Sequence, residues 1–394
     1  MKLTAIVDSP LSIGGGFNQA MAAVTQLQKL SRDRFNFVVA TSRRENVAYL
    51  KNLGIEAVYF RISIFDKILA LLGLSAFGQS IVGRWFLVSP FERRLTREGC
   101  DLVYFTMPSY LIRCLARLNY IVTIWDVCHR DFPEFPEVRG FQFFKRELFV
   151  SSCLSSAYKV IVDSEDLLTA VCHRYGLDRE RIIVMPFSPA SILNVSNAAS
   201  LDQVLALYKL EPGYLFYPAQ FWAHKNHIRL IQALALLKQR GVQFRLVLCG
   251  GDYGNLAHIR EQAELLGVAN DVTFLGFIPG EHLQALYKGS VAVVMPTYYG
   301  PTNIPPLEAW TMEKPLIYSA HLSGQARDAA LLADPDDATA WVDAIQMLQD
   351  PEIVDGLITK GRRRLAAIGE ERLNAEHALL SAIERFIRRR NCWK

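Results

Sequence analysis

The feature that most constrains the fold is an alternation of short apolar runs with longer amphipathic stretches, which the chain shows twice. In the first half, seven strand-like runs are separated by helix-length stretches such as Asn18–Leu30 and Asp166–Tyr175. The seven runs cover residues 3–7, 35–40, 57–60, 102–105, 120–125, 159–162 and 181–185. Apolar strands that alternate with helices predict a parallel sheet with helices on both faces.

The same alternation resumes in the second half after a break. Residues 188–200 are rich in Ser, Ala and Asn and have no sustained periodicity, which is typical of a linker. Five further strand-like runs follow, at 214–217, 244–249, 272–275, 291–295 and 316–318. We therefore predict an α/β protein with two doubly wound, Rossmann-like domains that face each other across a cleft.

The predicted domain boundaries follow from this break. We expect an N-terminal domain over residues 1–190, a linker over 191–207 and a C-terminal domain over 208–370. After Asp350-Pro351 the chain looks helical and basic to its end, and we assign residues 371–394 to a separate C-terminal helix. We expect this last helix to cross back to the N-terminal domain.

Composition and charge exclude several classes of protein. The chain has 394 residues and is 51% hydrophobic, so it is not a disordered protein. Its 43 basic and 39 acidic residues give a net charge of +4, which is too weak for a dedicated nucleic-acid binder. The seven cysteines are scattered and form no Cys-x-x-Cys, so the sequence predicts neither a disulfide framework nor a zinc site. A reduced, cytoplasmic protein is expected.

Residues 61–97 raise the question of membrane contact. The uncharged stretch Ile68–Gly83 is shorter than the roughly 20 residues of a spanning helix, its flanks carry a net charge of +4, and Trp85 and Phe86 lie beside it. One interpretation is a helix in the lipid headgroup region. The other is a pair of amphipathic helices packed on the sheet.

A glycine cluster, Gly14 to Gly16, follows the first strand-like run and precedes a helix. Glycines such as Gly15 and Gly16 allow a ligand phosphate to approach the backbone and the helix N-terminus. The dinucleotide pattern G-x-G-x-x-G fails at Gln19, and the second strand ends in Thr41-Ser42-Arg43 instead of a carboxylate. This argues against NAD. A tight turn without a ligand is the alternative.

A second motif, residues 217–227, leaves a strand and enters a helix. Lys225 would lie just before the helix N-terminus, with Asn226 as its cap. A cation beside free amides is a site for a diphosphate. His224 and His227 lack a third ligand nearby, so we predict a polar loop there and no metal site.

A third motif, residues 295–309, combines a strand end, a loop rich in Gly and Pro, and a helix opened by paired prolines. The amides around Thr302, Asn303 and Ile304 are expected to be unpaired and to point into the cleft. Glu308 is expected in the first helical turn, where its carboxylate accepts hydrogen bonds from two ribose hydroxyls. An ordinary capped helix with an acidic first turn is the alternative.

The motifs YPAQFWAHKNH and PTYYGPTNIPPLEAW together resemble the donor half of glycosyltransferase family 4. The likeness extends to Gly250-Gly251, to residues 274–278 and to residues 163–165. The resemblance implies a GT-B fold and a metal-independent, retaining nucleotide-sugar transferase without a cofactor. It also implies that the domain over residues 1–190 is the acceptor side and that the domain over 208–370 binds the nucleotide sugar. Its implied donor-binding residues are Gly15, Gly16, Gln220, Lys225, Asn226, Gly250, Phe277, Ile278, Gly300, Thr302, Asn303, Ile304 and Glu308.

The sequence departs from the family pattern at two of these positions. Gln220 stands where the family has Arg, and Gly300 stands where it has Glu. The charge of the diphosphate is then expected to rest on Lys225 and backbone amides, as in an oxyanion hole.

On the acceptor side, related enzymes place a His-Asp pair at the end of a strand in the first half. Trp125 occupies that histidine position here, and Asp126 and His129 are the polar residues nearby. We predict Asp126 and His129 as catalytic residues together with Lys225. A supporting role for either is the alternative.

The resemblance implies transfer of a mannosyl, rhamnosyl or glucosyl type of hexose from a nucleotide diphosphate to a glycan or lipid-linked acceptor in polysaccharide biosynthesis. No pair of carboxylates marks an acid and a base, which argues against glycoside hydrolysis. The alternatives are another GT-B enzyme, such as a sugar-nucleotide epimerase, and a degenerate glycan-binding protein. The presence of Lys225 and Glu308 argues against the second alternative.

Overall fold

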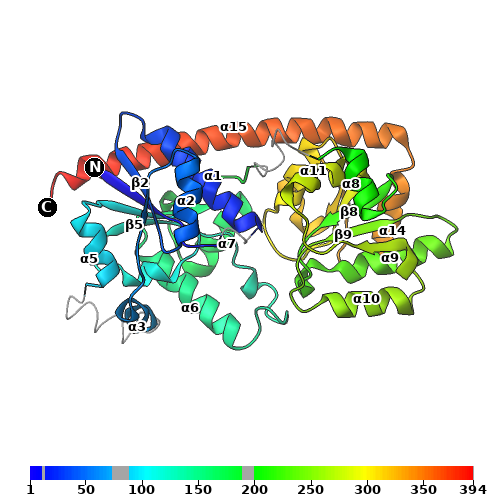
Figure 1. The fold of residues 1–394 in the computed structure, drawn as a ribbon, viewed down its shortest axis with the longest axis horizontal. Helices are drawn as coiled ribbons and strands as arrows, with labels where there is room; N and C mark the ends of the chain where they lie inside the picture. The colour runs from blue at the N-terminus through cyan, green and yellow to red at the C-terminus, as the bar shows by residue number, and fades with distance from the viewer. Residues whose placement is uncertain (11–13, 73–87, 189–198, 394) are drawn as a thin grey trace. The chain divides into compact units, whose positions relative to one another are not determined.

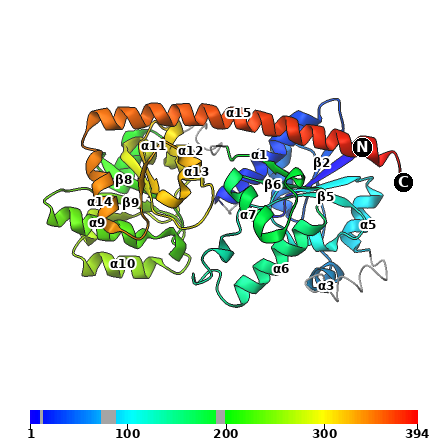
Figure 2. The ribbon, with the colours of Figure 1, turned by 180° about the vertical axis from the view of Figure 1, so that it is seen from behind.

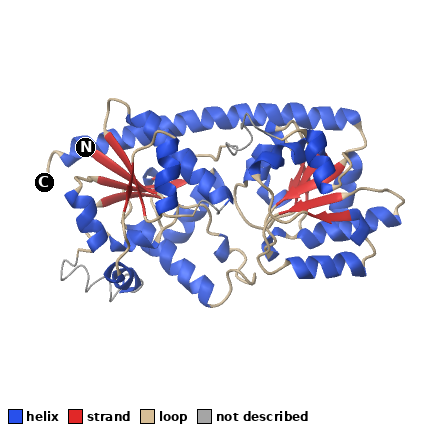
Figure 3. Ribbon diagram, in the orientation of Figure 1, coloured by secondary structure: helices blue, strands red, loops and turns tan. Residues whose placement is uncertain are grey.

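The computed structural model describes residues 1–10, 14–72, 88–188 and 199–393. It divides into two compact units (Figures 1 and 3). Unit 1 contains Met1–Pro133, Val138–Pro186 and Glu371–Lys394, whereas unit 2 contains Glu134–Glu137 and Phe187–Glu370. The short segment 134–137 of the first half thus belongs to unit 2.

Unit 1 is built on a seven-stranded parallel sheet of order β3-β2-β1-β4-β5-β6-β7. All seven strand-like runs of the first half form strands. Their bounds are β1 Lys2–Ile6, β2 Asn36–Thr41, β3 Ala57–Tyr59, β4 Leu102–Phe105, β5 Asn119–Thr123, β6 Lys159–Val162 and β7 Ile182–Val184.

Helices cover both faces of this sheet (Figure 2). Leu102 and Tyr104 of β4 face one core cluster, and Val103 and Phe105 face the other, because successive side chains of a strand point to opposite faces. The first cluster includes α1 (Gly14–Ser31), α2 (Arg44–Asn52) and the C-terminal part of α15 (Pro351–Arg390). The second includes α3 (Ile64–Leu72), α5 (Pro90–Arg97), α6 (Phe141–Ser155) and α7 (Glu165–Tyr175).

Unit 2 is built on a six-stranded parallel sheet of order β10-β9-β8-β11-β12-β13. The strands are β8 Tyr214–Pro218, β9 Leu246–Cys249, β10 Val272–Phe274, β11 Ser290–Met295, β12 Leu316–Ser319 and β13 Leu331–Ala333. The helices are α8 Leu201–Tyr208, α9 His227–Gln239, α10 Leu256–Leu265, α11 Gly280–Gly289, α12 Ile304–Thr311, α13 Ser323–Ala326 and α14 Ala338–Met347. Strand β13, which is only three residues long, is not predicted from the sequence.

Both sheets have the strand order 3-2-1-4-5-6 of the Rossmann fold, extended by one strand in unit 1. The prediction of two doubly wound domains is therefore confirmed. Two local features differ from the sequence analysis. Helix α8 occupies most of the second half of the predicted linker, and residues 371–390 do not start a helix but continue α15, which begins at Pro351 in unit 2 and ends in unit 1.

Candidate functional site

The two polar loops of unit 2 meet where the order of its sheet reverses. Strand β8 has β9 on one side and β11 on the other, so the loops after β8 and β11 leave neighbouring strands at their carboxyl ends. This position is where doubly wound sheets bind their ligands. The loops are residues 219–226 and 296–303, which contain six of the thirteen predicted donor-binding residues named above.

Lys225 brings the two loops together. It lies in a 3-10 turn, Ala223–Lys225, directly before α9, and its backbone carbonyl accepts a hydrogen bond from the Tyr217 hydroxyl at 3.0 Å. Its ammonium group lies 3.3 Å from Asn303 Oδ1 and 3.4 Å from Thr297 Oγ1. The first loop therefore presents a half-buried cation to polar side chains of the second.

The backbone amide of Asn303 corrects one expectation. This N–H donates to Gln325 Oε1 at 2.8 Å, so it is not an unpaired donor. Gln325 Nε2 in turn donates to the Asn303 carbonyl at 2.6 Å, and Asn303 Nδ2 donates to the Tyr318 hydroxyl at 2.7 Å. These contacts fix the Asn303 side chain with its Oδ1 toward Lys225. Gln325 and Tyr318 lie outside both motifs, and the sequence contains no local signal for their role.

Glu308 lies in the second turn of α12 rather than in the first, because the helix begins at Ile304 with Asn303 as its N-cap residue. The alternative of an acidic first turn is therefore wrong. The Glu308 side chain is almost fully buried, and its Oε2 accepts a hydrogen bond from the hydroxyl of Tyr287. Burial raises the pKa of Glu308 to about 7, which the hydrogen bond from Tyr287 only partly opposes. A buried carboxyl that titrates near neutral pH is typical of a functional site.

Gly300, at the position of the family's glutamate, has a backbone conformation that favours glycine. Its φ is +94°, and a Cβ there would lie 3.0 Å from the Thr302 carbonyl oxygen and 3.1 Å from the Asn303 amide group. A glutamate does not fit this loop without a change in its backbone.

We expect Gly300→Ala to lower the free energy of unfolding by roughly 1–3 kcal/mol, the cost of a strained backbone residue. Gly369→Ala is the control, because Gly369 lies in α15 with nothing within 4 Å of an added Cβ, and a helical Gly→Ala stabilises by ~0.5–1 kcal/mol. Chemical denaturation of both variants measures the difference. Equal stability of Gly300→Ala and wild type would show that the loop does not need glycine.

Gln220 takes part in an aromatic stack on the first loop. The indole N–H of Trp222 donates to Gln220 Oε1 at 3.0 Å, and the Trp222 ring stacks on Tyr253 with ring centroids 4.2 Å apart. Gly250 lets the loop after β9 approach this segment, since a Cβ at Gly250 would lie 2.3 Å from the Ala219 carbonyl oxygen. The neutral side chain of Gln220 thus orders the aromatic pair.

The remaining donor-side predictions fall at various positions of unit 2. Asn226 is the N-cap residue of α9 by position, but its side chain donates to the Pro335 carbonyl at 2.9 Å and does not cap the helix.

His227 is fully buried, with the centroids of the Tyr217 and Phe221 rings each 4.8 Å from that of its imidazole, so it does not converge with His224. The loop after β10 holds an exposed Phe277 and a partly buried Ile278, and Thr302 is also partly buried.

In unit 1, Asp126 lies just after β5. It forms an ion pair with Arg146 and accepts the Cys128 amide at 3.0 Å. Burial raises the pKa of Asp126, but the combined effect of Arg146 and the Cys128 amide is larger and brings the pKa below its ordinary value. The carboxyl is therefore ionised at neutral pH. These contacts favour a supporting role, and its part in acceptor binding stays a prediction.

His129 follows Asp126 and has no exposed surface. Its Nε2 lies 3.0 Å from Glu147 Oε2, which also accepts the Tyr175 hydroxyl at 3.0 Å. Burial lowers the pKa of His129, and the hydrogen bond to Glu147 opposes this only in part. The imidazole is therefore neutral at pH 7 and enclosed, so for His129 too the contacts favour a supporting role.

Gly15 and Gly16 lie in the first turn of α1, after β1, at the point where the sheet of unit 1 reverses its order. Asp8, two residues after β1, accepts a hydrogen bond from Ser109 at 2.9 Å, and burial raises the pKa of its carboxyl. Ser109 comes from the loop after β4. Asp8 was not among the predicted site residues.

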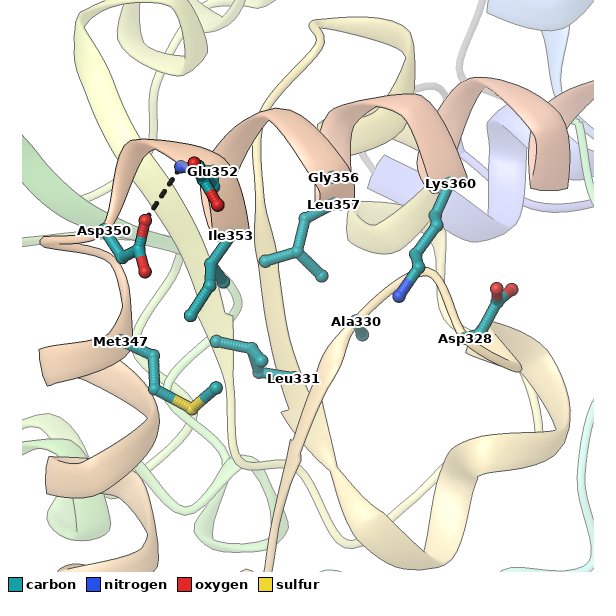
Figure 4. A pocket seen from close by; sticks show the side chains of 10 residues that line it. All are labelled: Asp328, Ala330, Leu331, Met347, Asp350, Glu352, Ile353, Gly356, Leu357 and Lys360. Carbon is teal, nitrogen blue, oxygen red and sulfur yellow. Dashed lines mark hydrogen bonds between the residues drawn. The ribbon is translucent and has the colours of Figure 1, made fainter.

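A separate hollow of about 370 Å³ lies beside β13 and the start of α15 (Figure 4). Its lining includes Asp328, Leu331, Met347, Ile353 and Lys360, and it contains none of the predicted site residues. We assign no function to it.

Comparisons with known proteins match this chain in two ways: a family model matches part of the sequence, and solved structures share the fold. Residues 206–364 match the family model "Glycosyl transferases group 1". An O-antigen chain mannosyltransferase B of Escherichia coli is 26% identical over 259 residues, which are 64% of this chain and 67% of the relative. A D-inositol 3-phosphate glycosyltransferase of Corynebacterium glutamicum is 25% identical over 263 residues, which are 62% of this chain and 61% of that protein.

A solved structure of Anabaena Alr3699/HepE in complex with UDP and glucose has a TM-score of 0.69 and 17% sequence identity, and it covers 98% of this chain and 100% of that one. At this identity the likeness concerns the fold. Together with the matched region and the named relatives, it supports a glycosyltransferase with a GT-B fold, in which residues 206–364 are similar to the group 1 glycosyl transferases.

Proposed function

We propose that this glycosyltransferase moves a hexose of the mannosyl, rhamnosyl or glucosyl type from a nucleotide diphosphate to a glycan or lipid-linked acceptor, with retention at the anomeric carbon. The observation that carries this proposal is the meeting of Lys225, Thr297 and Asn303 at the switch point of unit 2. The relatives named as a mannosyltransferase and an inositol phosphate glycosyltransferase support it.

In the proposed reaction, Lys225 stabilises the negative charge that grows on the departing diphosphate. The bond between the anomeric carbon and the diphosphate oxygen breaks, and the acceptor oxygen bonds to the same face of that carbon. The proton of the acceptor hydroxyl passes to a diphosphate oxygen. A fixed cation in a half-buried site lowers the barrier because it needs no reorganisation as the charge develops.

Glu308 is proposed to bind the ribose of the donor. One of its oxygens accepts the Tyr287 hydroxyl, and the other, Oε1, makes no hydrogen bond within the part of the chain that the structure describes. Accepted ribose hydroxyls would stabilise the ionised carboxylate, which burial alone disfavours. Donor binding is then expected to lower the pKa of Glu308 and to release a proton near pH 7.

The test is incubation with UDP-glucose, GDP-mannose or dTDP-rhamnose, with and without acceptor glycans. Acceptor-dependent release of the nucleotide diphosphate, with a product of unchanged anomeric configuration by NMR, is expected. Release without any acceptor would favour epimerase chemistry. Binding without turnover across a broad acceptor panel would favour a glycan-binding protein.

Helix α3 supports the proposal of peripheral membrane contact at the cytoplasmic face. Its outer face carries Ile64, Phe65, Ile68, Leu71 and Leu72, all exposed. Its inner face carries Asp66, which is fully buried and accepts the Phe91 amide of α5 at 3.0 Å. A helix with its apolar side chains outward suits the interfacial region of a bilayer.

The rest of this region bears on the same proposal. Exposed basic residues accompany α3 at Arg61, Lys67, Arg93, Arg94 and Arg97. The predicted Trp85 and Phe86 lie outside the described residues. No helix among those described is both long and apolar enough to span a bilayer.

We expect binding to anionic vesicles that falls as salt rises. Replacing Arg93, Arg94 and Arg97 by glutamine should remove on the order of 3 kcal/mol at low salt, at about 1 kcal/mol for each basic residue. Vesicle co-sedimentation measures both effects. Leu71→Ser should also weaken binding, whereas Leu265→Ser, on the exposed face of α10, is the control. Equal binding to neutral and anionic vesicles would contradict the proposal.

A further inference from the structure

The segment 134–137 holds His224 of the first loop in place. Glu137 Oε1 accepts the backbone N–H of His224 at 3.0 Å and also pairs with its Nδ1. The Phe135 ring packs edge-on against His224 and Tyr299, with centroids 6.5 and 5.5 Å away. The imidazole in turn stacks on Tyr299, with centroids 4.3 Å apart and planes 16° apart. His224 is thus fixed from two sides.

The carboxylate of Glu137 determines where the imidazole carries its proton. An ionised carboxylate only accepts, so Nδ1 of His224 is the donor and Nε2 is the nitrogen directed away from Glu137. Burial raises the pKa of Glu137, but the hydrogen bonds from the His224 ring and amide lower it below its ordinary value. An ionised carboxylate in contact with an imidazole favours its protonated, positively charged form.

His224 and Lys225 are anchored on the same residue of the second loop. The carbonyl of His224 accepts the Tyr298 amide at 2.9 Å and the Thr297 hydroxyl at 3.4 Å, and that hydroxyl also lies 3.4 Å from Lys225 Nζ. Gln220, at the family's arginine position, is neutral and bonded to Trp222. The loop therefore offers the cation of Lys225 and, next to it, an imidazole in contact with an ionised carboxylate.

We propose that His224, oriented by Glu137, is a second cation of the donor site, which binds the diphosphate of a nucleotide sugar beside Lys225. It would supply the charge that Gln220 lacks. Glu137 acts through His224 and is a positioning residue. This inference rests on the proposed function, because it assigns a ligand to the same site. It involves no additional bond-forming step.

The groups that face the imidazole define the expected pH dependence. Glu137 favours the charged ring, whereas Lys225 opposes it. Burial lowers the pKa of His227, at the start of α9, to about 3, so that ring is neutral. Tyr298 and Tyr299 come from the second loop, and the Tyr298 hydroxyl donates a hydrogen bond to Asp336. The contribution of His224 to donor affinity should fall as rising pH removes its proton, which is opposite in sign to the contribution of Glu308.

The experiment measures the affinity for UDP-glucose and GDP-mannose by calorimetry between pH 5.5 and 9, since their diphosphates do not titrate in this range. Because ionisation of Glu308 raises donor affinity as pH rises, wild type is compared with His224→Gln at each pH. The ratio of wild-type affinity to His224→Gln affinity should fall roughly tenfold or more from pH 5.5 to pH 9, the effect of losing one charge-assisted hydrogen bond. At pH 9 the two proteins should bind equally. Glu137→Gln, compared with His224→Gln in the same way, should move the midpoint of this fall to lower pH.

Glu134→Gln is the matched control, because Glu134 is exposed in the same segment, and it should behave as wild type does. A melting curve of each variant separates misfolding from a binding effect, and Glu137→Gln preserves shape if His224→Gln does not fold. An unchanged midpoint in Glu137→Gln, or the same pH profile in His224→Gln and wild type, overturns the inference alone. Absence of nucleotide-sugar binding by wild type overturns the proposed function as well.

Discussion

Lys225→Ala is expected to lower the rate of sugar transfer by a factor of about 10²–10³, the usual cost of removing one group that stabilises charge in a transition state. The side chain is half-buried, and the contacts of its ammonium group with Thr297 and Asn303 are long, at 3.4 and 3.3 Å. Its loss therefore removes little packing. Steady-state release of the nucleotide diphosphate measures the rate, and a melting curve should show a nearly unchanged transition.

The control for this variant is Lys288→Ala. Lys288 is an exposed lysine of α11, and its removal should change neither rate nor melting temperature. Turnover of Lys225→Ala within a few-fold of wild type would remove Lys225 from the mechanism.

Glu308→Gln is expected to bind UDP or GDP roughly tenfold more weakly, because hydrogen bonds to a charged acceptor contribute about 1.5–3 kcal/mol, more than those to a neutral amide. The effect should appear above pH 7, where the wild-type carboxyl is ionised. Below this pH the wild-type residue is neutral too, and the two proteins should converge. Calorimetry at pH 6 and pH 8 measures the difference.

The same substitution is expected to stabilise the ligand-free protein at high pH. The pKa of Glu308 rises from 4.5 to about 7 on folding, so between these pH values the folded state binds more protons than the unfolded state. Wild-type stability therefore falls as pH rises through this window, by up to on the order of 3 kcal/mol. The neutral amide of the Glu308→Gln variant carries no such charge, and denaturation of the variant should lack this loss.

Glu264→Gln serves as the control for both measurements, since Glu264 is exposed on α10. A Glu308→Gln protein that is less stable at pH 8 and binds nucleotide with wild-type affinity would contradict both the ribose contact and the buried charge.

The sequence by itself determined the two sheets and the position of the donor loops. A strand whose residues are apolar on both sides needs helices over both faces of its sheet, and the helix-length stretches between the runs supply them. All twelve apolar runs that the sequence analysis identified are strands of the two parallel sheets. Loops that follow strands at the switch point meet by topology, so Lys225 and Asn303 could be brought together from their places along the chain. Strand β13 is too short for such a pattern to mark it.

The tertiary structure alone decided the partners and the charge states. Gln325 lies 22 residues from Asn303, and Glu137 lies 87 residues from His224, so no local spacing connects them. Packing determined that His129 is enclosed and that Glu308 is buried in the second turn of α12. Burial and distant hydrogen-bond partners are what shift a pKa or pair an amide, and neither is encoded in the motif that contains the residue.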